Sequence, residues 1–214
     1  LGFKNYGDEY KVMGLAPYGK PKYFDKIKDN LFIKNKKSIF ELNLNYFNHH
    51  KNNFKYIAKD SLYIDEIFNS NLNKLFSSEF KSIINKDQFN KDFASSVQKI
   101  YEYFFKKIID KLYLKNFSKN LVFAGGCALN SSANRFITND NKLFEKVYIP
   151  CAPGDNGGAL GAAFVVSSHF KNKTQNYKNP YLGTEFSNDE VIKILNHDNY
   201  KNAVTYNFIE NDVD

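Results

Sequence analysis

The stretch LVFAGGCALNSSAN, residues 121–134, decides the fold together with KVYIPCAPGDNGGALGAA, residues 146–163. The apolar run LVFA ends in Gly125-Gly126, which is typical of a buried strand followed by a tight turn. Small and apolar residues suited to a helix follow it. The second stretch repeats this order with a short apolar strand, a glycine-rich turn and a helix of small residues. Residues 119–170 therefore predict a β-α-β-α unit of an α/β fold.

Both glycine turns join the end of a strand to the beginning of a helix. Free backbone N–H groups and the helix dipole make such a turn suited to anions, and ligands of open α/β sheets bind at this edge. The turns at Gly125-Gly126 and at 154–158 thus predict a nucleotide site, with phosphates near one turn and ribose or metal near the other. Neither turn has a Walker A or G-x-G-x-x-G pattern. Close packing of helix on strand remains the alternative for each turn taken alone.

Three polar side chains in these turns have two interpretations each. Asp155 can bind a hard cation or receive a proton, or it can cap the helix that begins near Gly157. Asn130 can hydrogen-bond a sugar or a base, or satisfy backbone groups of its own helix. Cys127 stands at a helix start, where a thiolate is stabilised. No histidine is nearby in the sequence, so packing explains Cys127 better than nucleophilic catalysis does.

The clearest helix is predicted at 88–114, where glycine and proline are absent. Its apolar residues recur at spacings of three and four, and they are Phe93, Val97, Ile100, Phe104, Ile108 and Leu112. Charged residues predict the opposite, solvated face, and they are Lys99, Glu102, Lys106 and Lys111.

Three further segments carry local signals. Alternating apolar and polar residues predict a half-buried strand at 38–47, and residues 48–86 read as short helices and loops. A helix is predicted at 187–196, where Ser187 and Glu190 have the spacing of a capping box.

Composition excludes several classes of protein. The 214 residues are 43% apolar and 25% charged, which is enough for one or two globular domains and argues against disorder. The longest run of apolar and small residues, 159–166, is too short to cross a bilayer. The net charge of +7 permits an anionic partner, but the lysines are spread along the chain, so nucleic-acid binding is not favoured. Two cysteines fit a reducing compartment, and a cytoplasmic location is expected.

Three stretches taken together resemble the O-carbamoyltransferases of nodulation and antibiotic biosynthesis. They are EYKVMGLAPYGKP (9–21), LVFAGGCALNSSAN (121–134) and PCAPGDNGGALGAA (150–163). FASSVQKIYE (93–102) and NPYLGTEFS (179–187) are also similar to segments of that family. Order and spacing agree over most of the chain and are weakest at 48–86.

The resemblance implies a ribonuclease H-like, actin-like (ASKHA) lobe: a mixed sheet flanked by helices. The lobe would span 1–170 with a helical insertion at about 48–115, and 171–214 would lead toward a downstream domain. The implied enzyme uses ATP and carbamoyl phosphate to form carbamoyl-adenylate, and transfers the carbamoyl group to a hydroxyl of a sugar or natural product. A divalent metal, Fe²⁺ or Mg²⁺, would lie between two upstream histidines and Asp155.

The resemblance also implies the residues of the site. Those matching the nucleotide-binding turns are Gly125, Gly126, Asn130, Gly154, Asn156 and Gly157. Glu9 and Lys11 match the charged part of the first motif and would lie near ribose or phosphate. Asp155 is the implied metal ligand.

Two family features are not present in these 214 residues, namely an H-x-x-x-H pair before the first motif and an adenylate-forming domain with a GPRALG-like signature. We therefore expect this chain to be one lobe of the site and to be inactive in carbamoyl transfer by itself. Two alternatives stay open. One is a tRNA threonylcarbamoyladenosine-type ATPase or sugar kinase of the same fold, although KVMGLAPYG argues against both. The other is a non-enzymatic, basic binding module.

Overall fold

The computed structural model describes residues 1–3, 7–33, 38–51, 57–58, 62–63, 67–138, 143–169 and 183–207. The chain divides into two compact units, Leu1–Ala163 and Phe164–Asp214. The boundary falls inside helix α7 (Gly157–His169). Among the described residues, every helix is too short or too polar to span a lipid bilayer.

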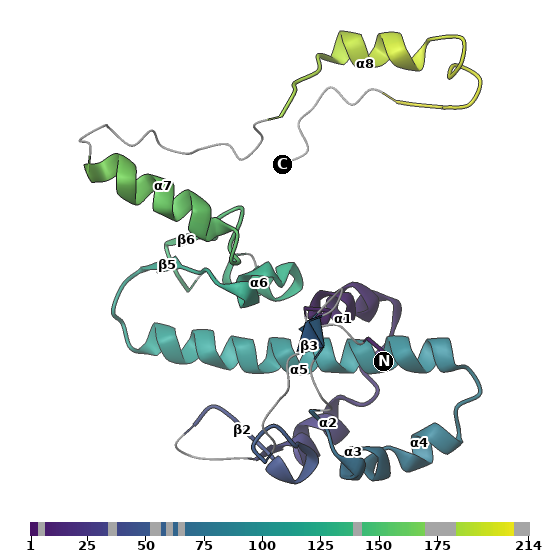
Figure 1. The fold of residues 1–214 in the computed structure, drawn as a ribbon, viewed down its shortest axis with the longest axis vertical. Helices are drawn as coiled ribbons and strands as arrows, with labels where there is room; N and C mark the ends of the chain where they lie inside the picture. Colours follow the sequence, from purple (N-terminus) through teal and green to yellow (C-terminus); the bar gives the residue numbers. More distant parts are fainter. Residues whose placement is uncertain are drawn as a thin grey trace. The chain divides into compact units, whose positions relative to one another are not determined.

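Helices dominate the first unit (Figure 1). In chain order they are α1 (Glu9–Leu15), η1 (Ala16–Tyr18), α2 (Phe24–Leu31), η2 (Leu44–Tyr46), α3 (Ser70–Leu75), α4 (Ser77–Lys81), α5 (Lys86–Leu114), η3 (Gly126–Leu129) and α6 (Ser131–Thr138). The strands are β1 (Phe32–Ile33), β2 (Glu41–Leu42), β3 (Ile57–Ala58), β4 (Leu62–Tyr63), β5 (Asn120–Val122) and β6 (Lys146–Tyr148).

Helix α5, with 29 residues, confirms the helix predicted at 88–114. It begins because the Asn85 side chain accepts a hydrogen bond from the Gln88 N–H at 3.0 Å, which satisfies a free donor of the first turn. It ends at Leu114, and Asn116 then adopts a positive φ of 51°, as polar residues after helices often do.

Two hydrophobic cores lie on opposite sides of α5. Ile100 and Ile109 are nine residues apart, about two and a half turns, and so point in opposite directions. The first core is formed by Ile27, Leu31, Phe76, Ile100 and Phe104. The second is formed by Phe105, Ile109, Ala133, Ile137 and Phe144. Helix α5 is therefore the element on which the other parts of this unit pack.

This double packing corrects the predicted polar and apolar faces. Glu102, expected in solvent, is 8% exposed, because α6 and its neighbours cover that side of the helix. Ile108 and Leu112, expected in the core, are 41% and 37% exposed. They lie on the same face of α5 as Ile100 and Phe104, but further along the helix than the residues that form the first core.

Residues 19–23, which follow α1 and η1, are hydrogen-bonded to buried polar side chains of α5. The Lys20 N–H donates to Asp92 Oδ1 at 2.8 Å, and the Tyr23 N–H donates to Ser96 Oγ at 2.9 Å. Asp92 is 2% exposed and also forms an ion pair with Lys22. Burial alone would raise the pKa of Asp92, but hydrogen bonds from Lys22, the Lys20 N–H and Gln88 outweigh it and hold the pKa below its usual range.

The strand predicted at 38–47 is wrong over most of its length. Glu41–Leu42 is paired antiparallel to β1, and at the far end Phe47 is extended and forms a single antiparallel bridge with Phe68. Asn43 then bends the chain, since its side chain accepts a hydrogen bond from the Asn45 N–H at 3.3 Å and η2 follows. Such Asn turns compete with a strand that the alternation of residues otherwise favours.

Strands β5 and β6 are parallel, with Leu121 opposite Val147. Together with η3, α6 and α7 they confirm the predicted order strand, turn, helix, strand, turn, helix. The α/β class is thus correct. Among the described residues, however, the strands form three separate two-stranded sheets and no larger mixed sheet.

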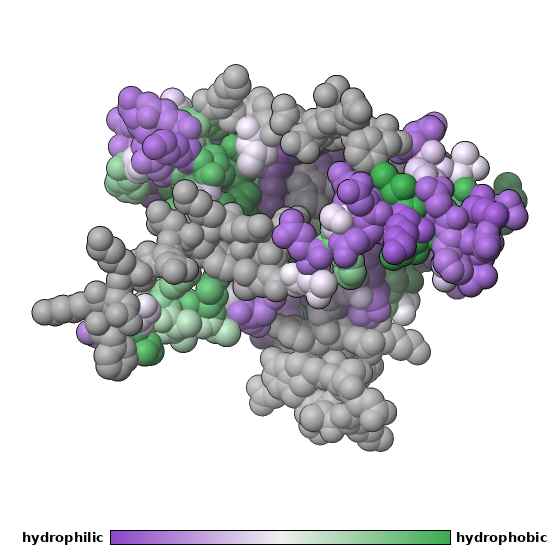
Figure 2. All heavy atoms as spheres, turned by 90° about the horizontal axis from the view of Figure 1, so that it is seen from above, coloured by the Kyte–Doolittle hydropathy of each residue, from purple (hydrophilic) through white to green (hydrophobic). Residues whose placement is uncertain are grey.

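These two strands were predicted to be buried, and in the structure only one face of them packs against a core. Leu121 and Val147 pack against the second core. Val122 and Tyr148 alternate to the other side, as strand geometry requires, and are 71% and 57% exposed. Figure 2 shows green hydrophobic patches beside purple hydrophilic ones on the face that it draws.

In the second unit, α8 (Asn188–Leu195) carries the predicted capping box. Ser187 Oγ accepts from the Glu190 N–H at 3.3 Å, and the Ser187 N–H donates to Glu190 Oε2 at 2.8 Å. The Ser187 N–H and the Ser187 hydroxyl both donate to the Glu190 carboxylate, and these two hydrogen bonds lower the pKa of Glu190. Residues 170–182, which include part of the NPYLGTEFS motif, lie outside the described residues.

Replacing Ser187 with alanine is expected to weaken the first turn of α8. Loss of a serine cap costs about 1 kcal/mol, which is about a fivefold change in the local opening equilibrium. Amide hydrogen exchange of residues 189–192 measures it. Ser187→Thr keeps the hydroxyl and should retain wild-type exchange. Unchanged exchange in Ser187→Ala would contradict the role of the cap.

Candidate nucleotide-binding turns

The two glycine turns meet at the carboxyl ends of β5 and β6. The Phe123 N–H donates to the Tyr148 carbonyl at 3.0 Å, and beyond the strands the Gly125 N–H donates to the Pro153 carbonyl at 2.7 Å. The expectation that both turns lie at one end of neighbouring strands is therefore confirmed.

In the first turn, glycine is required at one position. Gly125 adopts a φ of 101°, a region that residues with a Cβ rarely enter. Gly126 begins η3, and among the described residues the N–H groups of Gly126 and Cys127 have no hydrogen-bond acceptor. Two backbone donors of this kind can bind an anion such as a phosphate.

Asn130 follows η3 and caps α6. Its Oδ1 accepts from the Ala133 N–H at 3.1 Å and from Gln98 Nε2 at 3.0 Å, and its Nδ2 donates to Gln98 Oε1 at 3.1 Å. The structure thus combines the capping interpretation with a side-chain pair that was not predicted. One of the two Nδ2 hydrogens has no partner in the described part of the chain and is available to a ligand.

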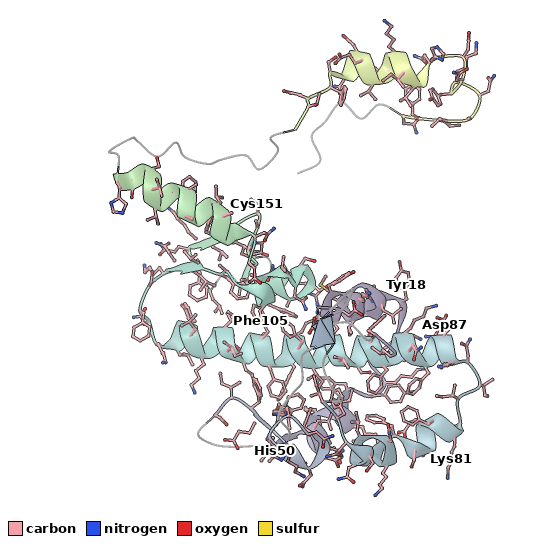
Figure 3. All side chains as sticks on the ribbon, viewed as in Figure 1. Tyr18, His50, Lys81, Asp87, Phe105 and Cys151 are labelled. Atoms are coloured by element: carbon pink, nitrogen blue, oxygen red, sulfur yellow. The ribbon has the colours of Figure 1, made fainter. Side chains whose placement is uncertain are left out.

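In the second turn, Gly157 is required by a close approach. A Cβ built on it would lie 2.1 Å from the Ala152 carbonyl oxygen, and one on Gly154 would lie 3.3 Å from Leu129 Cδ1. The turn is closed by the Gly157 and Gly158 N–H groups, which donate to the carbonyls of Gly154 and Asp155 at 3.0 Å each. Figure 3 shows Cys151 at the start of this turn, before α7.

The Asp155 side chain is exposed. Within the described ranges its carboxylate takes part in no hydrogen bond or ion pair, so the structure gives no support to the capping alternative. A free carboxylate suits a divalent cation. No cluster of three or more His, Cys, Asp or Glu that could hold a metal occurs among the described residues. The role of Asp155 as a metal ligand therefore stays a prediction. Asn156 follows it and is also exposed.

Replacing Gly157 with alanine should destabilise the first unit by about 1–2 kcal/mol, because the Ala152 loop must shift to admit the new methyl group. Gly158→Ala is the matched control in the same turn of helix, since nothing lies within 4 Å of a Cβ there. It should be neutral or slightly stabilising. Urea denaturation of both variants makes the comparison, and equal stabilities would show that the close approach is unimportant.

Glu9 and Lys11 lie on α1, and Lys11 forms an ion pair with Asp8 at 2.7 Å. The hydrogen bond to Asp8 raises the pKa of Lys11. In the parts of the chain that the structure describes, no hydrogen bond or ion pair joins either residue to the glycine turns. Their role near ribose or phosphate stays a prediction.

Three residues on α5 were not predicted as part of this region. Gln98 and Glu102 are each 8% exposed and hydrogen-bonded to one another at 3.0 Å. The Tyr101 hydroxyl donates to the Cys127 carbonyl at 3.2 Å, and burial above all raises the pKa of Tyr101. The signal that could have found them is the i, i+4 spacing of Gln98 and Glu102 beside apolar positions. Cys127 and Cys151 are both free and exposed.

These features define an α/β protein with paired glycine turns at the carboxyl ends of parallel strands. The family described as Carbamoyltransferase N-terminus matches residues 1–164, and the chain belongs to this family. The resemblance found in the three sequence motifs is confirmed.

Similar proteins agree with this placement. An uncharacterized protein of Synechocystis sp. is 35% identical over 201 residues, which are 91% of this chain and 31% of that protein. Nodulation protein NolNO of Sinorhizobium fredii is 27% identical over 197 residues, which are 90% of this chain and 26% of that protein. Nodulation protein U of the same organism is 44% identical over 46 residues, or 22% of this chain and 8% of that protein. The chain thus spans less than a third of the length of these relatives.

Proposed function

We propose that this chain supplies nucleotide-binding turns to an O-carbamoyltransferase. The observation that carries the proposal is the Gly125 N–H to Pro153 carbonyl hydrogen bond, which joins the two turns in a chain of the carbamoyltransferase family. The proposed enzyme takes ATP and carbamoyl phosphate, and it transfers the carbamoyl group of carbamoyl-adenylate to a hydroxyl of a sugar or natural product.

The proposed roles follow from what each group can offer. The free N–H groups of Gly126 and Cys127 bind the phosphate of the nucleotide, and the Asn130 amide donates to a hydroxyl or ring nitrogen. Asp155 is the proposed ligand of a divalent cation, Fe²⁺ or Mg²⁺, with further ligands from outside the described residues. Such a cation supplies positive charge beside the phosphate. The actin-like (ASKHA) architecture is part of the same proposal and rests on the sequence resemblance.

Asp155→Asn tests the metal role in the complete gene product. Wild type should be stabilised by ATP with Mg²⁺ or Fe²⁺ in a thermal-shift titration, because binding to the folded state raises the melting temperature. The variant should bind ATP as wild type does when no metal is present. With metal, its affinity for ATP should be about tenfold lower than that of wild type. Asp110→Asn is the control, since Asp110 is a partly exposed aspartate on α5 paired with Lys106.

Two outcomes would contradict the proposal. Stabilisation by short RNA, with none by ATP and metal, would favour the basic binding module. Equal metal dependence in wild type and Asp155→Asn would remove Asp155 from the site. The activity itself is tested by mass spectrometry of carbamoyl-adenylate and carbamoylated sugars, and we expect the 214-residue chain alone to form neither.

A further inference from the structure

A series of hydrogen-bonded polar side chains connects α5 to the first glycine turn. Glu102 Oε1 accepts from Gln98 Nε2 at 3.0 Å, and Gln98 pairs with the Asn130 amide through two hydrogen bonds of 3.0 and 3.1 Å. Gln98 and Glu102 are each 8% exposed. Arg135 of α6 lies 3.9 Å from Glu102 Oε2 and closes this series at its far end.

The chemistry of these groups fixes which way each amide faces. A carboxylate can only accept, so the Gln98 atom beside Glu102 is the NH₂ group. The Gln98 carbonyl oxygen is then left to accept from Asn130, and the atom of Asn130 opposite it is Nδ2. The Ala133 N–H sets the same orientation independently, because it needs the Asn130 oxygen as its acceptor.

The consequence concerns the remaining hydrogen of Asn130 Nδ2. If the amide could rotate by 180°, the group offered to a ligand would alternate between donor and acceptor. Glu102 orients Gln98, and Gln98 together with the Ala133 N–H of α6 orients the Asn130 amide. The group that Asn130 offers to a ligand is therefore a donor. Buried hydrogen-bond networks whose members are all satisfied give this kind of specificity.

We propose that Gln98 and Glu102 are positioning residues that fix the Asn130 side chain as a hydrogen-bond donor to the nucleotide. The proposal rests on the proposed function, since it takes the nucleotide as the ligand of the glycine turns. The ligand atom it calls for is an acceptor, such as a ribose oxygen or a ring nitrogen. Neither Gln98 nor Glu102 needs to touch the ligand.

The test is a double-mutant cycle on ATP affinity, measured by titration calorimetry on the complete gene product. Asn130→Asp keeps a capping oxygen for α6 but removes the donor, so the helix is preserved and ATP should bind about tenfold more weakly. Gln98→Met removes the orienting amide at similar volume and should also weaken ATP about tenfold. The double variant should be no weaker than Asn130→Asp, since Gln98 acts only through Asn130.

Gln88→Met is the matched control, the same change in the same helix at a glutamine that contacts Asp92 instead. It should leave ATP affinity unchanged. Additive losses in the double variant, or unchanged affinity in Gln98→Met, would overturn the positioning role alone. Unchanged affinity in Asn130→Asp would overturn the positioning role and also remove Asn130 from the proposed nucleotide contacts. Failure of the wild-type protein to bind ATP would overturn the proposed function and the positioning role with it. Thermal melting of each variant shows whether a loss of affinity is only a loss of folding.

Discussion

Gly19→Ala should destabilise the first unit by about 3 kcal/mol, at the upper end of what overpacking costs. A Cβ on Gly19 would lie 2.1 Å from the Lys91 carbonyl oxygen and 2.5 Å from the Asp92 backbone nitrogen. These atoms belong to the interior of α5 and cannot move without breaking helical hydrogen bonds. Residues 19–23 must therefore move away from α5, and this movement also breaks the hydrogen bond between the Lys20 N–H and Asp92.

Gly14→Ala is the control that separates this contact from a general effect of removing glycine. Gly14 lies within α1, and nothing lies within 4 Å of a Cβ there. Alanine should be neutral or stabilise the helix by up to about 1 kcal/mol. Denaturant unfolding followed by circular dichroism compares the two variants. A wild-type midpoint for Gly19→Ala would show that the segment does not pack on α5 as described.

Features encoded by neighbouring residues were predictable. The long helix could be read from residues 88–114 because a repeat of three and four with no glycine or proline determines a helix locally. The capping box at Ser187 needs only four residues. Each glycine turn comes directly after a short apolar run in the sequence, which is enough to predict a strand followed by a turn. Each of these signals lies within a few residues of the structure it produces.

Features that depend on distant partners were not predictable. Asp92 is a charged residue on a helix, for which solvent is the ordinary expectation. It is buried because Lys20 and Lys22, some 70 residues earlier, come to lie against it. Glu102 is hidden for the same reason, since α6 and its neighbours cover it. Residues 38–47 show the opposite failure: the alternation is present, but β1 offers only two residues for pairing.

The candidate site likewise has one part that local sequence predicts and one part that depends on distant residues. The meeting of the turns at Gly125 and Pro153 follows from parallel strands, which a sequence can predict. The amide pair of Gln98 and Asn130 joins residues 32 positions apart and has no local signature. A search for polar residues at i, i+4 on an apolar face would have found Gln98 and Glu102, but not their partner.

Asp92→Ala is the second change with a large expected effect, a loss of about 3 kcal/mol at pH 7. It removes the acceptor of the Lys20 N–H and of Gln88 Nε2, bonds of 2.8 and 2.9 Å, and leaves the Lys20 N–H without its protein partner. Gln88 is exposed, so its amide can hydrogen-bond to water instead. Lys22 is 55% exposed and can turn to water, so it adds little to the cost. Asp92→Asn keeps an acceptor oxygen and should lose less than half as much. Asp87→Asn, at an exposed aspartate of the same helix paired with Lys91, should stay within about 0.5 kcal/mol of wild type.

The same carboxylate makes the stability of wild type depend on pH in a predictable direction. Its pKa is lower in the folded chain than the usual value of about 3.9 in an unfolded one. Its ionised form therefore stabilises the fold fully above that value, and this contribution is lost as the pH falls through the folded pKa. The difference in unfolding free energy between wild type and Asp92→Asn should be constant from pH 7 to pH 5 and shrink below about pH 4. Urea denaturation at pH 7, 5, 4 and 3 measures it. A difference that stays constant to pH 3 would mean that the Asp92 charge does not hold the segment to α5.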